Sequence, residues 1–316
     1  MKNFMKVAAI AALAFVSTNA MAQYSPEAGD ISTEVQFNPF NSNTQTFGLK
    51  GLKFRYFLTN QDAIRLNLNF NIDNNTTTTK GALNDKFDGV TSSTIRNSEL
   101  ETKTTATTFK VGLGYERHFF QQNRIDLYAG GELGYEGIFR SGEQNYSMTS
   151  TASNTTGGVT TTTNRTVTQN VKFEKMMPTT TTLVGDATTG QPTPSVAYNR
   201  NSFYAQIFTG IDFYIYKGLY VGTEFGIKFA TGSNPVNGTF TQDYSSTVVN
   251  TTGTTTTTTT RNWNYNSETG VCAGKQTTTG AADTNINVAY TAQDHSASST
   301  SIGLYIEPAF RLGWKF

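Results

Sequence analysis

The chain has 316 residues, a formal net charge of +1 and only 15% charged residues. No strong basic or acidic field results, so the composition argues against nucleic-acid binding. Glycine (28 residues) and aromatic residues (12%) are plentiful, which favours strands and turns over helices. Cys272 is the single cysteine, which excludes an intramolecular disulfide and a metal site built on thiolates.

Residues 1–22 predict a secretory signal peptide. Lys2 and Lys6 provide the positive start, residues 7–16 form a short apolar core, and Ala20-Met21-Ala22 is a small-x-small cleavage site. The core is too short to span a bilayer as a helix. We therefore expect a signal peptide at 1–22 and one mature domain at 23–316.

Eight later stretches alternate apolar and polar residues with a period of two, which predicts strands with one apolar face. They are 29–40, 48–58, 62–73, 108–120, 124–140, 201–215, 218–230 and 301–316. Each is about as long as a tilted strand that crosses a bilayer, and short turns alternate with long links. This pattern predicts an all-β, eight-stranded antiparallel transmembrane β-barrel, with short periplasmic turns and long Thr-rich extracellular loops. A soluble sandwich or lipocalin shows similar alternation, but charges of both signs on the polar faces and the length of the links disfavour it.

The long links are rich in threonine and low in complexity, as in "TTGTTTTTTTRNWNY". Two readings stay open: a flexible polar fringe, or β-hairpins that continue the strands beyond the membrane. Segments 165–175 and 284–294 favour hairpins.

The last strand, "SIGLYIEPAFRLGWKF", ends on an aromatic residue. With the signal peptide, the alternating strands and the short and long links, it resembles small outer-membrane barrels of the OmpA and OmpX kind. The Asn/Thr-rich links resemble outer-membrane β-barrel domain proteins of Bacteroidota. The resemblance implies the cell outer membrane of a Gram-negative bacterium and a C-terminal strand that the barrel assembly machinery recognises, carried by Phe316, Trp314, Leu312 and Phe310. Pro308 inside this strand departs from the family pattern.

The polar faces of the predicted strands carry charges that we expect to line the lumen. An eight-stranded barrel is just wide enough for side chains to fill, and buried charges must be paired. The near balance of sign favours a network that plugs the lumen, and a narrow ion pathway is the alternative. The predicted network comprises Glu34, Lys53, Arg55, Arg65, Lys110, Glu116, Asp126, Glu132, Glu136, Arg140, Asp212, Glu224, Lys228, Glu307 and Arg311.

An enzymatic role is disfavoured, because barrel enzymes that modify lipids or cleave proteins resemble one another in needing histidine with a serine or a carboxylate. The chain has two histidines. We expect His118 at the membrane interface near a periplasmic turn. His295 lies between Asp294 and Ser296, but neighbours in a strand point to opposite faces, so adjacency makes no triad. We find no motif for a cofactor or a metal and expect none.

The sequence therefore predicts a non-catalytic outer-membrane barrel whose surface loops act as a scaffold or bind a partner. A narrow passive porin for small solutes is the alternative, and a lipid-modifying enzyme or protease is a distant third. The expected partners are outer-membrane lipid, the barrel assembly machinery during insertion, and a surface or protein partner through 74–105, 141–200 and 231–299.

Overall fold

The computed structural model describes residues 26–37, 49–86, 92–122, 124–179, 196–216, 218–251, 255–289 and 296–315. The predicted signal peptide lies outside these ranges. The described residues form fifteen strands: β1 Ile31–Phe37, β2 Leu49–Phe57, β3 Asp62–Lys86, β4 Ser92–Gln122, β5 Ile125–Thr156, β6 Val159–Glu174, β7 Met176–Pro178, β8 Val196–Tyr198, β9 Arg200–Tyr216, β10 Leu219–Pro235, β11 Thr239–Asn250, β12 Thr255–Asn266, β13 Val271–Thr278, β14 Thr284–Ala289 and β15 Ser296–Lys315. In this described part no helix is long and apolar enough to cross a membrane.

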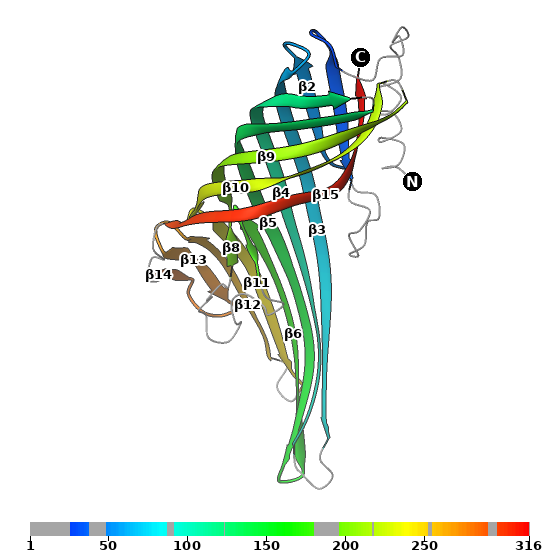
Figure 1. Cartoon of the computed structure of the whole chain (residues 1–316). Helices are drawn as coiled ribbons and strands as arrows, with labels where there is room; N and C mark the ends of the chain where they lie inside the picture. The colour runs from blue at the N-terminus through cyan, green and yellow to red at the C-terminus, as the bar shows by residue number, and fades with distance from the viewer. Residues whose placement is uncertain are drawn as a thin grey trace.

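Every strand pairing in the described chain is antiparallel, which confirms the predicted sheet type. Strands β1 to β5 pair in sequence order. β5 also pairs with β9, β9 with β10, β10 with β15, and β15 with β1. Figure 1 shows these strands wrapped around one end of the molecule, where the chain terminates.

The fifteen strands exceed the eight that alternation predicted, because the Thr-rich links also fold into strands. β3 and β4 stay paired as far as Lys86 and Ser93, well inside a segment expected to be a loop. Threonine is branched at Cβ and favours extended backbone, and cross-strand hydrogen bonds satisfy that backbone. Of the two readings of the links, the structure supports hairpins in the described segments.

The sheet divides along β5. Residues Ile125–Ile138 pair with β9, whereas Ser141–Thr156 pair with β6. Beyond this fork the order is β6, β11, β12, β13 and β14. We call this part the outer sheet; it comprises β3 from Asn74, β4 to Thr105, β5 from Ser141, β6 and β11–β14. Figure 1 shows β4, β5 and β6 running far from the wrapped end.

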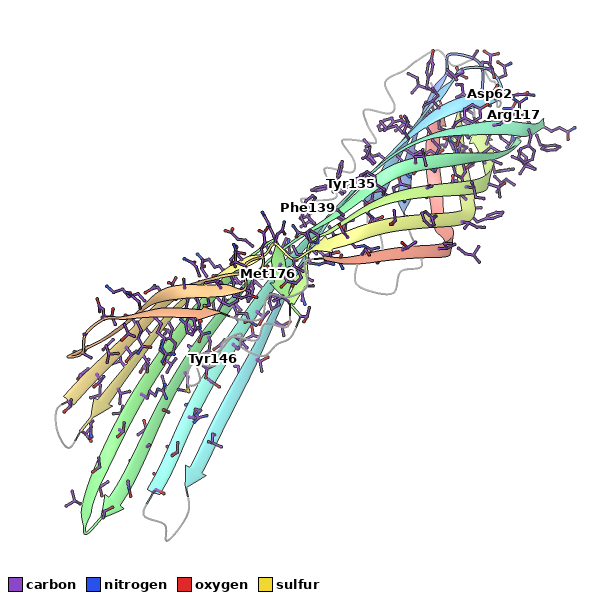
Figure 2. All side chains as sticks on the ribbon, turned by 90° about the vertical axis from the view of Figure 1, so that its left-hand side faces the viewer. Asp62, Arg117, Tyr135, Phe139, Tyr146 and Met176 are labelled. Carbon is purple, nitrogen blue, oxygen red and sulfur yellow. The ribbon has the colours of Figure 1, made fainter. Side chains whose placement is uncertain are left out.

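A short two-stranded sheet, formed by β7 and β8, lies at the fork. β6 ends at Glu174, and the next residue, Lys175, has a left-handed φ of 59°, so the chain turns away from β5 and forms β7. β7 pairs with β8, in register Met176 to Tyr198. Gly142 permits this approach, because a Cβ there would lie 2.8 Å from Pro178 Cδ. Figure 2 places Met176 between the two halves of the molecule.

One face of the wrapped strands is apolar and exposed. On β3 it extends from Ile64 to Ile72 and becomes polar at Asn74. On β5 the change from apolar to polar falls between Phe139 and Ser141. Phe139 and Ile72 lie at the same height, because both pair with the same residue of β4. The apolar band therefore ends at a common height, and the outer sheet begins there.

Candidate functional site

The opposite face of the wrapped strands carries fully buried charges. They come from seven strands, and each has at most 2% of its surface exposed. They are Glu34, Lys53, Arg55, Arg65, Glu116, Asp126, Glu132, Asp212 and Glu224. Alternation places them all on one face of their strands, and the wrapping brings the strands around a shared interior.

Arg65 is the centre of one part of this cluster. Its Nε lies 2.8 Å from Glu132 Oε2, and its Nη1 lies 2.9 Å from Glu224 Oε2 and 3.3 Å from Glu116 Oε2. The guanidinium also lies over the Phe208 ring, 3.7 Å from its centroid. Carboxylates from β4, β5 and β10 thus converge on one cation of β3.

Arg55 is the centre of the other part of the cluster. Its Nη1 lies 2.6 Å from Asp212 Oδ2 and 2.8 Å from Glu34 Oε1, and its Nε lies 2.5 Å from Glu116 Oε1. Lys53 Nζ lies 3.1 Å from Glu224 Oε2. Since an unpaired buried charge is strongly destabilising, these bonds hold β1, β2, β4, β9 and β10 in one arrangement.

His118 is buried rather than interfacial, so its expected position is wrong. Its Nδ1 lies 2.8 Å from Asp126, and its Nε2 lies 3.5 Å from Glu116 Oε1. The ring points inward because His118 lies two residues after Glu116 on β4, and alternate residues of a strand share one face. Its described polar partners are two carboxylates, which places it in the ion-pair cluster. His295 lies outside the described residues.

A half-buried layer lies between this cluster and the outer sheet. Lys228 Nζ lies 2.8 Å from Glu136 Oε2, and Lys110 and Lys228 lie 4.7 and 4.8 Å from the centroid of the Tyr204 ring. Arg140 belongs to the same face, at the fork. Tyr204 donates a 2.7 Å hydrogen bond to Glu132 Oε1, which links the two layers.

Some predicted residues cannot be placed. The side chains of Glu307, Phe310, Arg311 and Leu312 are outside the described part, and so is Phe316 as a whole. Trp314 is half-buried in β15, between Thr33 of β1 and Leu219 of β10. The proposed assembly signal therefore stays a prediction.

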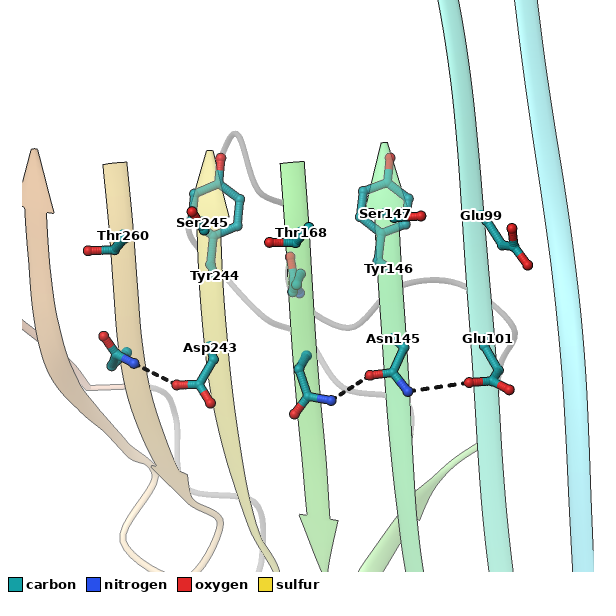
Figure 3. A pocket seen from close by; sticks show the side chains of 13 residues that line it. Glu99, Glu101, Asn145, Tyr146, Ser147, Thr168, Asp243, Tyr244, Ser245 and Thr260 are labelled. Carbon is teal, nitrogen blue, oxygen red and sulfur yellow. Dashed lines mark hydrogen bonds between the residues drawn. The ribbon is translucent and has the colours of Figure 1, made fainter. Parts of the chain in front are cut away.

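The outer sheet carries a polar face that sequence reasoning did not find. Glu101, Asn145, Asn170, Asp243 and Asn262 lie opposite one another on five adjacent strands. Asn170 donates a 2.5 Å hydrogen bond to Asn145, and Asn262 donates one of 2.5 Å to Asp243 (Figure 3). Side chains of this row and the next line a shallow hollow of about 690 Å³. The row joins segments far apart in sequence, and the only sequence signal was the alternation within each segment.

The reverse face of the outer sheet has its own core. Val171, Phe173, Met176, Phe240, Trp263, Tyr265 and Cys272 form a buried apolar cluster, against which Val196 and Tyr198 of β8 pack. The sheet is therefore a packed structure and not an isolated set of hairpins. Among the described residues, no group of His, Cys, Asp and Glu side chains is arranged to hold a metal ion.

Comparison with protein families identifies the family of the chain. Residues 36–230 match the model of the putative OmpA-OmpF-like porin family, which covers more than half of the chain. Searches of curated proteins and of solved structures found no match. The resemblance to outer-membrane β-barrels of the OmpA kind is confirmed by this match, while the likeness to Bacteroidota proteins is not tested by it. On this evidence the chain belongs to the putative OmpA-OmpF-like porin family.

Proposed function

We propose that the protein is a non-catalytic, eight-stranded outer-membrane β-barrel with a sealed interior, which presents the outer sheet as a scaffold for a partner at the cell surface. The successive pairings of β1–β5, β9, β10 and β15 support a closed barrel, because β15 pairs with β10 on one side and β1 on the other. Family membership supports the outer-membrane location.

The exposed apolar band supports a lipid-facing surface. On β3 it runs from Ile64 to Ile72, which matches the roughly 9–11 residues that a tilted transmembrane strand needs. Exposed Phe225, Ile227 and Phe229 of β10 continue the band. A signal peptide at 1–22 would supply export to this membrane. The partner-binding surface would then be the polar face of the outer sheet, on the extracellular side.

The burial of Arg55 and Arg65 is the observation that supports a seal. Both are at most 1% exposed, and each contacts carboxylates from three other strands. A water-filled channel through the same cross-section would leave these groups accessible. The family description as a porin favours a second candidate, a narrow pore lined by the same charges.

Conductance of the refolded chain in a planar bilayer separates these two functions. We expect the native chain to be silent and Glu132→Gln to flicker open, because this substitution removes a carboxylate that holds Arg65. Glu99→Gln, an exposed carboxylate of the outer sheet, is the matched control and should stay silent.

Steady conductance from the native chain would refute the seal and support the porin. The described interior cluster has six carboxylates against three Lys and Arg residues, so any open state should be selective for cations. Selectivity that Glu132→Gln shifts away from cations would then assign the pore to this cluster.

A further inference from the structure

We infer that the outer end of the interior binds a phosphate group. The site is a set of side chains that we call the cationic mouth: Lys110, Glu136, Arg140, Arg200 and Lys228. It goes beyond the proposed seal, because it lies above the buried ion pairs. The inference rests on the proposed barrel in one respect: the barrel would open the mouth to the cell exterior.

Strand register brings these side chains together. Lys110 of β4 pairs with Glu136 of β5, which pairs with Ser202 of β9. Arg200 lies two residues before Ser202, and Arg140 lies four after Glu136, so both occupy the inward face of their strands one or two steps further out. Lys228 reaches the same place from β10, through its 2.8 Å ion pair with Glu136.

The mouth has an excess of positive charge. Among the described side chains of the mouth, four cations face one carboxylate, and Glu136 interacts electrostatically with Lys228, Lys110 and Arg200 together. Arg140 and Arg200 repel one another. Like charges at this separation are unfavourable where water is partly excluded, and Lys228 and Glu136 are only 27% and 25% exposed. A bound anion would relieve this repulsion.

One buried hydrogen-bond donor at the mouth is also unused. Arg140 donates through Nη1 to the Tyr198 carbonyl, which fixes the guanidinium, but its buried Nε has no hydrogen-bond partner among the described residues. Arg200 Nε is held by Ser202 Oγ at 3.1 Å. Two oriented guanidinium groups and two ammonium groups form the donor set that tetrahedral oxyanions prefer.

The layer below confines an anion to the mouth. The buried cluster has twice as many carboxylates as Lys and Arg residues among the described side chains, so it repels an anion that moves inward. The ligand is therefore a phosphate held near the surface, and not one in transit. Its source is either a soluble phosphate ester or the phosphate of an outer-leaflet lipid headgroup.

Calorimetric titration of the refolded chain in neutral detergent tests the inference. The probes are inorganic phosphate and, separately, a diphosphorylated disaccharide lipid headgroup with its dephosphorylated form as reference. We expect phosphate binding that weakens with added NaCl. The double variant Arg140→Gln/Arg200→Gln should bind at least about tenfold more weakly, since it removes two charge-assisted contacts. Lys275→Gln, which removes an exposed lysine of the outer sheet, should bind like the native chain.

Each outcome is decisive. Binding of both probes identifies a general phosphate site, and binding of the lipid headgroup alone identifies the lipid as the source. No binding of either probe by the native chain, or unchanged binding by the double variant, overturns the inference. Retained resistance of the β-structure to dodecyl sulfate shows that the variant is folded. A native chain that conducts steadily yet binds phosphate would refute the seal and leave this site standing.

Discussion

Arg55 and Arg65 illustrate how single residues organise the interior. Each joins carboxylates that are distant in the sequence; Arg65 and Glu224, for example, are 159 residues apart. Such pairs contribute little relative to a well-packed apolar core, but the loss of one partner leaves buried charges uncompensated. Their effect is therefore specificity: the contacts are satisfied in one arrangement of the strands.

Replacement of Arg65 by Gln should lower the free energy of unfolding by about 3–5 kcal/mol, because it removes the cation that three buried carboxylates share. Urea titration of the chain in detergent micelles, followed by tryptophan fluorescence, measures this change. Arg117→Gln is the matched control, since Arg117 is 60% exposed and pairs with Asp62 at the rim (Figure 2). Exposed pairs contribute roughly 0–1 kcal/mol, so similar losses for both variants would contradict the role given to Arg65.

At the scale of elements, the outer sheet depends on its apolar cluster. The Phe240 ring of β11 stacks against the Tyr265 ring of β12, with 4.9 Å between ring centroids, and its centroid lies 5.8 Å from that of the Phe173 ring of β6. Cys272 of β13 is completely buried in the same cluster. The cluster thus joins five strands, β6, β7, β11, β12 and β13, and the reactivity of the thiol reports on whether they stay together.

Burial raises the pKa of the Cys272 thiol to about 11. The thiolate is therefore a minor species at pH 8 in the folded chain, and the native thiol should react with iodoacetamide far more slowly than the urea-unfolded thiol at that pH. Phe240→Ala should weaken the cluster by about 3–5 kcal/mol and raise the labelling rate about a hundredfold or more. Mass spectrometry of the labelled chain measures the rate.

Thr241→Ala is the control for this prediction, because Thr241 is the exposed neighbour of Phe240 on β11. Its labelling rate should match that of the native chain. Rapid labelling of the native chain at pH 8 would show that the outer sheet is not packed as described.

The elements also show how far the sequence could be read. Alternation located the strands of the wrapped end, since Ile64 to Ile72 or Phe225 to Phe229 repeat with a period of two over their whole length. It could not count the strands in runs such as 255–260, where every residue is threonine and no face is distinguished. It predicted which charges point inward, but it did not predict which of them meet, because Arg55 meets Asp212 only through the pairing of distant strands.

His118 shows the same limit. Its position beside a turn predicted the membrane interface, whereas it lies on the inward face of β4, two residues after Glu116, and contacts Asp126. The row on the outer sheet was equally hidden, because Asn145 and Asp243 enter one row only through Asn170 of β6, which pairs with both.

At the scale of the whole molecule, β11–β14 of the outer sheet are separable from the wrapped strands. Pro235 at the end of β10 pairs directly with Ser296 at the start of β15, although 60 residues lie between them. Those residues include β11–β14, none of which pairs with β9, β10 or β15 in the described chain. The connection could therefore be as short as a hairpin turn.

Replacement of 236–295 by Asn-Gly should leave a folded, membrane-inserted chain, since this dipeptide closes a two-residue hairpin. Resistance to dodecyl sulfate and silent bilayers would show that the wrapped strands and the seal persist. Loss of the β6 partner β11 should expose Val171 and Phe173, so increased protease cleavage is expected in 159–174. Failure of this variant to insert would show that β11–β14 are required for the barrel itself.

The fork in β5 also has a mechanical consequence. β4 and β5 run without interruption from the wrapped end to the tip of the outer sheet. At about 3.3 Å per residue, the 16 residues Ser141–Thr156 reach roughly 50 Å beyond the apolar band. A partner bound at the tip would thus be held at a fixed distance and direction from the apolar band by two long, paired strands. A lateral force on it would be transmitted along β4 and β5 to the buried ion pairs of Glu116 and Glu132.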